Sequence, residues 1–192
     1  MKIKLKSAPI GKLERVNEKI LAWFYANPNA RIGLNELSKC LMASKSSTKQ
    51  MIEILINQNF LKRDMIGRAW ILSVNQENPH FRIKKISYNL DKIYESKVVD
   101  AIYGSFPNSK SIILFGSYRK GDDNEKSDVD IAVEVLDNKN LEIKTMGFIP
   151  ELGYRKNVPV NIHIFSRNKI DLNLFANIVN GIVLSGFLEA KP

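Results

Sequence analysis

Two aspartates one residue apart, Asp128 and Asp130, follow an apolar run and a charged loop in the stretch LFGSYRKGDDNEKSDVDIAVE, residues 114–134. In a β-strand, residues two positions apart point to the same face, so a strand DVDIAVEV would present both carboxylates to one place. Unpaired, the two carboxylates repel one another and destabilise such a strand. A divalent cation removes that cost, and a hard, oxygen-liganded ion such as Mg²⁺ suits the pair. The pair therefore predicts a strand that carries a metal site.

A Gly-Ser pair precedes these aspartates at the end of another expected strand. The run SIILF, residues 111–115, has the character of a buried strand, and Gly116 and Ser117 lie where it ends. Glycine allows the backbone to approach a ligand closely, and free N–H groups in such a turn or at a helix start form an anion site. A metal beside a phosphate-binding turn indicates phosphoryl or nucleotidyl transfer.

The stretch GSYRKGDDNEKSDVDIAV resembles the signature of the DNA polymerase beta-type nucleotidyltransferase superfamily, in which a Gly-Ser turn is followed about a dozen residues later by Asp-x-Asp. The upstream apolar strand, Gly121 and Ser127 complete the same arrangement. Within the superfamily, the chain looks like the small prokaryotic, especially archaeal, nucleotidyltransferase-domain proteins that carry an N-terminal winged helix. The resemblance covers residues 78–184.

This resemblance implies a magnesium-dependent transfer of a nucleoside monophosphate from a nucleoside triphosphate (NTP) to a hydroxyl acceptor. Gly116 and Ser117 would hold the β and γ phosphates, and Lys120 matches a position that is usually basic. The aspartate pair would bind the Mg²⁺ ions, with in-line displacement of pyrophosphate. Arg119 would be either an extra phosphate contact or, as the slightly preferred interpretation, a solvent-facing side chain.

The superfamily has a third carboxylate on a later strand, and the chain departs from the pattern there. The candidate strand is VPVNIHIF, residues 158–165, whose polar-face positions are Asn161 and His163. An amide is a poor substitute for the acid, and an imidazole is softer than Mg²⁺ prefers. His163 is therefore expected to be a catalytic general base, or else an edge histidine with no role. Glu134, farther along the face of the aspartates, is another candidate for the third carboxylate.

Positive charge is concentrated in the first half of the chain. Residues 1–90 contain 16 Lys and Arg against 6 Asp and Glu, whereas residues 91–192 contain 13 against 14. A basic half joined to a nearly neutral half indicates that the first half meets a polyanion. The alternative is a set of solvated lysines.

The basic half also has the pattern of a winged helix-turn-helix between residues 12 and 74. Apolar spacing predicts three helices in succession, followed by two strands around a turn at Gly67. Ser46 or Ser47 is expected to cap the third helix. Such a helix enters the DNA major groove by its N-terminal end, with the ribbon along the flanking backbone. The expected DNA contacts are Lys45, Ser46, Ser47, Lys49, Gln50, Lys62, Arg63 and Arg68. A protein-interaction or dimerisation module is the alternative.

The fold class predicted from these patterns is α+β. We expect a winged helix-turn-helix over residues 1–77, a linker over 78–90 that starts near Pro79, and a small nucleotidyltransferase domain over 91–192 with a mixed sheet flanked by helices. The start of the chain lacks the apolar core of a secretory signal, and no apolar run approaches the roughly 20 residues that span a bilayer. Cys40 is the single cysteine. These features favour a cytoplasmic protein that does not associate with a membrane.

Two functions from different classes follow. The first is a nucleotidyltransferase with Mg²⁺ as cofactor and a DNA-binding winged helix. The second is a DNA-binding regulator or antitoxin-like protein, whose degenerate transferase domain only binds nucleotide or a partner. The intact Gly-Ser and Asp-x-Asp favour the first function, and the absent third acid favours the second. The expected partners are an NTP and DNA, and the resemblance is compatible with a protein partner encoded nearby and with a homodimer.

Overall fold

The computed structural model describes residues 5–10 and 15–189 of the chain. The helices are α1 (Val16–Ala26), α2 (Leu34–Cys40), α3 (Lys45–Asn57), α4 (Pro79–Glu95), α5 (Val98–Ser105), α6 (Gly116–Lys120), the 3-10 helix η1 (Arg167–Lys169) and α7 (Leu172–Val179). The strands are β1 (Ala8–Pro9), β2 (Ile32–Gly33), β3 (Leu61–Ile66), β4 (Ala69–Val74), β5 (Ser111–Phe115), β6 (Val129–Glu134), β7 (Glu142–Gly153), β8 (Arg155–Phe165) and β9 (Ile182–Gly186). None of the described helices combines the length and apolar character that crossing a bilayer requires.

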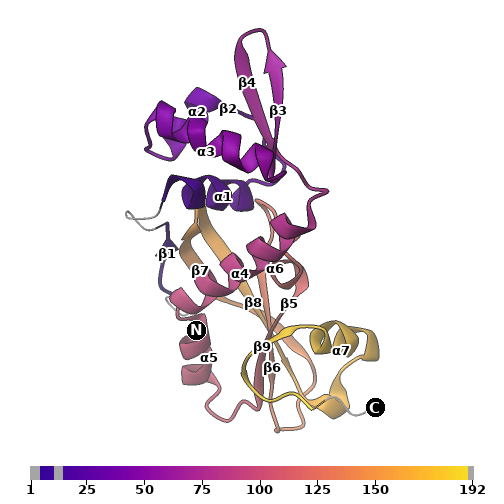
Figure 1. Ribbon diagram of the computed structural model, residues 1–192. Coiled ribbons are helices and arrows are strands. Elements are labelled where there is room, and N and C mark those ends of the chain that lie inside the picture. The colour runs from indigo at the N-terminus through magenta and orange to yellow at the C-terminus, as the bar shows by residue number, and fades with distance from the viewer. Residues whose placement is uncertain (1–4, 11–14, 190–192) are drawn as a thin grey trace.

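The N-terminal unit packs α1, α2 and α3 against a three-stranded sheet of order β2-β4-β3 (Figure 1). Its core is apolar because one side of each helix repeats large aliphatic and aromatic residues, among them Ile20, Phe24, Leu37 and Ile52, and Leu72 of β4 packs with them. The hairpin of β3 and β4 extends beyond these helices at one end of the molecule.

The helix α3 begins two or three residues earlier than the sequence suggested. Ser44, rather than Ser46 or Ser47, is the N-cap, and its Oγ accepts a hydrogen bond from the amide of Ser47 at 3.0 Å. Gly67 lies between β3 and β4 with a φ of +59°, the left-handed conformation that suits glycine. The hairpin turn expected at Gly67 is confirmed.

The C-terminal unit is built on a curled, mixed sheet of order β1-β7-β8-β6-β5-β9. Strand β6 lies in its interior, antiparallel to β5 and parallel to β8. Helices α4 and α5 cover one face, where Ile93 and Ile102 are fully buried, and α7 packs on the other face through Ile178 (Figure 1). Burial on both faces explains why β5 and β6 have nearly continuous apolar runs.

Two segments differ from the division into domains that the sequence suggested. Residues 78–90, expected as a linker, form the cap and most of α4. Pro79 occupies the first turn, where its missing N–H is no loss, and the Asn78 side chain accepts a hydrogen bond from the His80 amide at 2.9 Å. In addition, β1 pairs in parallel with β7, with Ala8 opposite Leu152. Residues 8 and 9 therefore belong to the C-terminal sheet, although they precede the N-terminal unit in sequence.

Helix α4 contacts the cores of both units. Near its start, Phe81 packs on Tyr25 of α1 with ring centroids 5.0 Å apart. Near its end, Ile93 lies in the core of the C-terminal sheet. Between these positions Lys85 and Asn89 are buried polar residues that face the second unit.

Candidate active site

Strand pairing brings the Gly-Ser turn and the aspartates together. Asp130 lies opposite Phe115, the last residue of β5, and Gly116 follows directly. Gly116 has a φ of +71°, and a Cβ atom built there would lie 2.8 Å from Asp130 Oδ2. The backbone of the turn thus packs against the Asp130 carboxylate, and glycine is required for this approach. Ser117 follows in the first turn of α6.

The polar positions of β8 lie beside the two aspartates. Parallel pairing places Asn161 next to Asp130 and His163 two residues farther along. The Asn161 amide donates a hydrogen bond to Asp128 Oδ2 at 3.0 Å, and His163 Nε2 lies 3.4 Å from Asp130 Oδ1. His163 also meets the Phe115 ring edge-on, with the centroids 4.8 Å apart. An amide and an imidazole therefore touch the two carboxylates.

Glu134 does not stand in for the missing acid. It lies at the far end of β6 and is buried, with 2% of its surface exposed. Ser111 donates a hydrogen bond to its Oε2 at 3.0 Å, and Arg167 Nη2 lies 3.0 Å from its Oε1. A buried carboxylate needs such partners, so the interpretation of Glu134 as a stand-in is wrong.

The donor set of the aspartate pair fits Mg²⁺. This ion commonly binds through one or two carboxylates, keeps several waters and completes its shell with phosphate oxygens. Asp128 and Asp130 supply the two carboxylates, and both are only half-buried. Residues 5–10 and 15–189 contain no group of three or more His, Cys, Asp or Glu that could hold a metal by itself. A metal at this site would therefore need oxygen ligands from water or substrate.

A cavity of about 260 Å³ opens beside the Gly-Ser turn. One wall is formed by Phe115, Gly116, Arg119 and Lys120, and the other wall by residues of α7 and the turn that follows it, Leu174, Asn177 and Asn180. Arg119 is half-buried and lines this cavity, so it does not simply face bulk solvent. The α7 wall had no sequence signal, because nothing in a short amphipathic helix indicates which strand end it covers.

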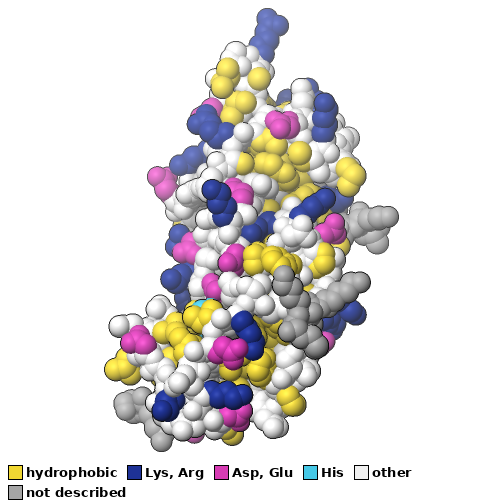
Figure 2. Space-filling model, turned by 180° about the vertical axis from the view of Figure 1, so that it is seen from behind, with side chains coloured by type: hydrophobic (Ala, Val, Ile, Leu, Met, Phe, Trp, Pro, Cys, Tyr) yellow, Lys and Arg dark blue, Asp and Glu magenta, His cyan; other side chains and the backbone are white. Residues whose placement is uncertain are grey.

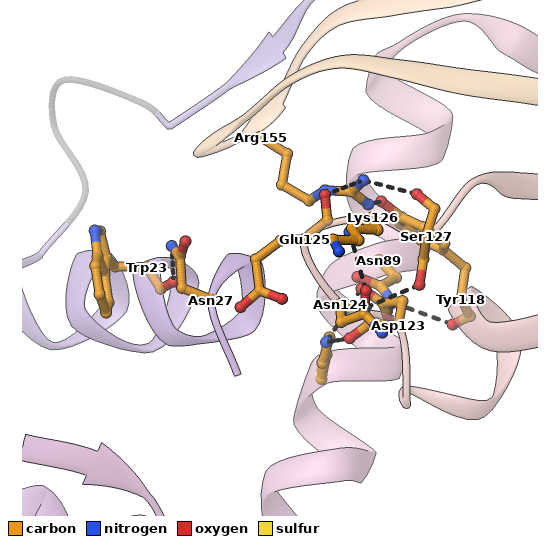
Figure 3. A network of polar contacts seen from close by, with 11 residues as sticks. Trp23, Asn27, Asn89, Tyr118, Asp123, Asn124, Glu125, Lys126, Ser127 and Arg155 are labelled. Atoms are coloured by element: carbon orange, nitrogen blue, oxygen red, sulfur yellow. Dashed lines mark hydrogen bonds and ion pairs between the residues drawn. The ribbon is translucent and has the colours of Figure 1, made fainter. Parts of the chain in front are cut away.

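A polar network holds the loop between α6 and β6 (Figure 3). Asp123 Oδ2 lies 3.1 Å from Lys85 Nζ, and Asn89 donates hydrogen bonds to Asp123 Oδ1 at 2.8 Å and to the Tyr118 carbonyl at 3.1 Å. Burial raises the pKa of Asp123 and lowers the pKa of Lys85, and the opposite charge of the partner counteracts each shift.

The end of the same loop is held by Arg155, at the start of β8. Its Nη2 donates hydrogen bonds to the carbonyl oxygens of Ser127 at 2.7 Å and Glu125 at 3.1 Å. Its Nη1 donates to the hydroxyl of Tyr118, a side chain with 2% of its surface exposed. Burial raises the pKa of Tyr118, so this phenol stays protonated. Arg155 was not singled out from the sequence.

Some of the residues expected to contact DNA line a groove, and the others lie outside it. A groove of about 680 Å³ lies between the starts of α2 and α3 and the hairpin, and Lys45, Lys49, Arg68 and Trp70 line it. Figure 2 shows Lys and Arg side chains at the hairpin end and along this unit. Ser46, Ser47 and Gln50 are exposed on the first turns of α3.

Two basic side chains flank Trp70. Lys49 Nζ and the Arg63 guanidinium lie 5.1 and 4.4 Å from the centre of its ring. Lys62, in contrast, forms an ion pair with Glu77 at 3.0 Å and is not part of the groove. The structure therefore gathers Lys45, Lys49 and Arg68 and places Lys62 elsewhere.

Comparison with known proteins gives a match in the second half of the chain. The family model of the nucleotidyltransferase domain matches residues 95–183, from the end of α4 into β9. No curated protein matches the chain. The matched segment includes the Gly-Ser turn, both aspartates, Asn161 and His163. Residues 95–183 are thus similar to a nucleotidyltransferase domain and have a mixed α+β fold, a similarity that suggests nucleotide transfer.

Proposed function

We propose that the protein is a magnesium-dependent nucleotidyltransferase that moves a nucleoside monophosphate from an NTP to a hydroxyl acceptor. The observation that carries this proposal is the contact of Gly116 with Asp130, beside Asp128, within the segment that matches the nucleotidyltransferase domain. A close backbone approach beside two carboxylates suits a triphosphate and its metal.

In this proposal, the oxygen of the acceptor attacks the α-phosphorus, the bond to the bridging oxygen breaks, and pyrophosphate leaves. Asp128 and Asp130 would hold Mg²⁺, which supplies charge neutralisation on the triphosphate and activation of the attacking hydroxyl. Gly116 and Ser117 would bind the β and γ phosphates. Lys120 lines the adjoining cavity and adds positive charge there.

Two residues would take over what the absent third acid does. Asn161 fixes the Asp128 carboxylate through its hydrogen bond. His163 Nε2 is near Asp130, while its Nδ1 is buried without a hydrogen-bond partner among the described residues. We assign His163 as the general base for the acceptor hydroxyl, because no further carboxylate of the described residues lies with the pair.

We further propose that the N-terminal unit is a winged helix-turn-helix that binds duplex DNA. The order of three helices and a hairpin supports this proposal, as do the exposed start of α3 and the groove lined by Lys45, Lys49 and Arg68. A regulator with a degenerate transferase site is the second candidate. The contact of Asn161, rather than an acid, with Asp128 favours it.

Thermal denaturation with Mg²⁺ and each of the four NTPs tests the nucleotide site, followed by transfer of radiolabel to cell extract or total RNA. At a ligand concentration of a hundred times Kd, stability should rise by about 2.7 kcal/mol. Asp128→Asn with Asp130→Asn should abolish the rise, whereas the exposed pair Asp100→Asn with Asp137→Asn should retain it. An undiminished rise in the first double variant would contradict the site. A rise without transfer would favour the regulator.

A further inference from the structure

We propose that Arg155 is a positioning residue for Asp128, an inference that rests on the proposed function of the aspartate pair. Arg155 lies outside the Gly-Ser and Asp-x-Asp stretch, at the start of β8. It contacts neither carboxylate. Its guanidinium instead binds the backbone that leads directly into Asp128 (Figure 3).

The argument begins with the peptide that precedes Asp128. The Arg155 Nη2 bond to the Ser127 carbonyl measures 2.7 Å. Because a peptide unit is planar, fixing that carbonyl also fixes the amide nitrogen and Cα of Asp128. The second bond, to the Glu125 carbonyl at 3.1 Å, adds a separate point of attachment. One rigid fork thus sets where the Asp128 side chain starts.

The bonds within the loop do not achieve this. The Asn124 amide donates to Ser127 Oγ at 3.0 Å, and the Lys126 amide donates to Asn124 Oδ1 at 2.9 Å. These contacts give residues 124–127 a local shape but no fixed place on the sheet. The position of the loop on the sheet depends on contacts with other elements. Arg155 of β8 binds one end of the loop, and α4 binds the other end at Asp123.

The anchor at Asp123 completes the attachment. Asp123 has 3% of its surface exposed and binds Lys85 and Asn89 of α4. Asn89 also binds the Tyr118 carbonyl, and the Tyr118 hydroxyl accepts from Arg155. The two anchors are therefore joined through α6. A loop held at both ends keeps Asp128 beside Asp130 without help from a ligand.

A variant of Arg155 distinguishes a purely structural role from the positioning role, because the two roles predict different effects on metal binding. A residue that only stabilises the fold would lower the melting temperature and leave the metal requirement unchanged. A positioning residue would loosen the loop and weaken metal binding in a protein that stays folded. Residues that orient metal ligands in this way typically change metal affinity 10- to 100-fold.

The experiment compares full-length Arg155→Met and Arg155→Lys with Lys156→Met, which changes an exposed neighbour on the same strand. Amide hydrogen exchange of residues 121–128 is measured without ligand, and the Mg²⁺ requirement of the NTP-dependent thermal shift is titrated with MgCl₂ and ATP. Arg155→Met should raise exchange in residues 124–128, leave β5 protected, and raise the Mg²⁺ requirement about 10- to 100-fold. Arg155→Lys should be intermediate, because a single ammonium cannot reproduce the fork.

Unchanged exchange, or an unchanged Mg²⁺ requirement in a protein whose wild type responds to Mg²⁺, would overturn the positioning role. Should Arg155→Met not fold, Arg155→Lys carries the same comparison. A wild type that responds to no combination of Mg²⁺ and NTP would contradict the proposed function instead. In that case the exchange of residues 124–128 alone supports or overturns the attachment of the loop by Arg155.

Discussion

The side-chain amide of Asn161 donates a hydrogen bond to Asp128 Oδ2 at 3.0 Å, from a strand that runs parallel to β6. The amide thus stands where an acid would bring a third negative charge. Thr145 Oγ1 donates to the Asn161 oxygen at 2.9 Å, which orients the amide nitrogen toward the aspartate. The site therefore consists of two carboxylates, one amide donor and the His163 imidazole beside Asp130.

Asn161→Asp should make stability depend on the metal. The change removes a hydrogen bond and places three carboxylates together, so without metal the free energy of unfolding should fall by about 1–3 kcal/mol. Urea denaturation with and without MgCl₂ measures this, and Mg²⁺ should restore most of the loss. The exposed Asn108→Asp is the control. If Mg²⁺ restores nothing, the aspartates do not form a metal site. Transfer gained in this variant by an inactive wild type would identify a degenerate enzyme.

Gly116→Ala should destabilise the protein and abolish the nucleotide-dependent thermal shift. The new Cβ would lie 2.8 Å from Asp130 Oδ2 at a backbone φ of +71°, so both the turn and the carboxylate must move. Gly104→Ala is the matched control, because this helical glycine has nothing within 4 Å of its built Cβ. That control should stabilise the protein by about 0.5–1 kcal/mol. A normal shift in Gly116→Ala would contradict the close approach.

Lys85→Met should leave Asp123 buried without its cation and cost about 3–5 kcal/mol near neutral pH. Burial already raises the pKa of Asp123, and Lys85 opposes that rise. In the variant, the folded-state pKa therefore lies farther above the unfolded value of about 3.9. The stability linked to this carboxyl is then complete below about pH 3.9 and is lost as pH rises through the raised pKa.

The loss caused by Lys85→Met should consequently be smallest in acid. Urea denaturation of the variant and the wild type between pH 4 and 8, at steps of about one pH unit, measures the difference in the free energy of unfolding. Lys84→Met, at an exposed neighbour on α4, should show no such trend. A constant difference across this range would mean that Asp123 does not carry the buried charge.

Lys49→Ala with Arg68→Ala should weaken DNA binding by the full-length protein and flatten its salt dependence. Each phosphate contact contributes about −0.9 to the slope of log K against log salt, so loss of two contacts should reduce the slope by about 1.8. Fluorescence anisotropy of a labelled duplex over a salt series measures this slope.

Lys156→Ala with Lys169→Ala removes two exposed lysines of the C-terminal unit and should leave the slope intact. An equal effect of both pairs would indicate diffuse attraction by net charge. No DNA affinity at low salt would favour a protein-interaction surface for the groove.

The strands of the site could be predicted because their signals are local. An apolar run that ends at Gly116 predicts β5, and the Asp-x-Asp that leads into a second apolar run predicts β6, although Asp128 lies one residue before that strand. Asn161 and His163 lie beside the aspartates, as the pattern of β8 indicated. The start of α4 was missed because Pro79 was treated as a break, whereas its cap makes it the first turn of a helix.

Long-range contacts account for the rest. Arg155 acts through backbone carbonyls of residues that are 28 and 30 positions away in the sequence. Every residue has such a carbonyl, so no residue type in the loop indicates the contact. The pairing of Glu134 with Arg167 depends on the turn after β8, which no period in the sequence indicates. The strand β1 is too short to show an alternation at all.

The edge strand β1 gives the chain an unusual path. Residues 8–9 lie in the C-terminal sheet, the N-terminal unit follows in sequence, and α4 leads back to that sheet, so the N-terminal unit is inserted into its neighbour. Because α4 contacts the cores of both units, a displacement of the N-terminal unit would act on the helix that carries Lys85 and Asn89, the partners of Asp123. A cut after residue 77 would also separate β1 from the sheet that it borders.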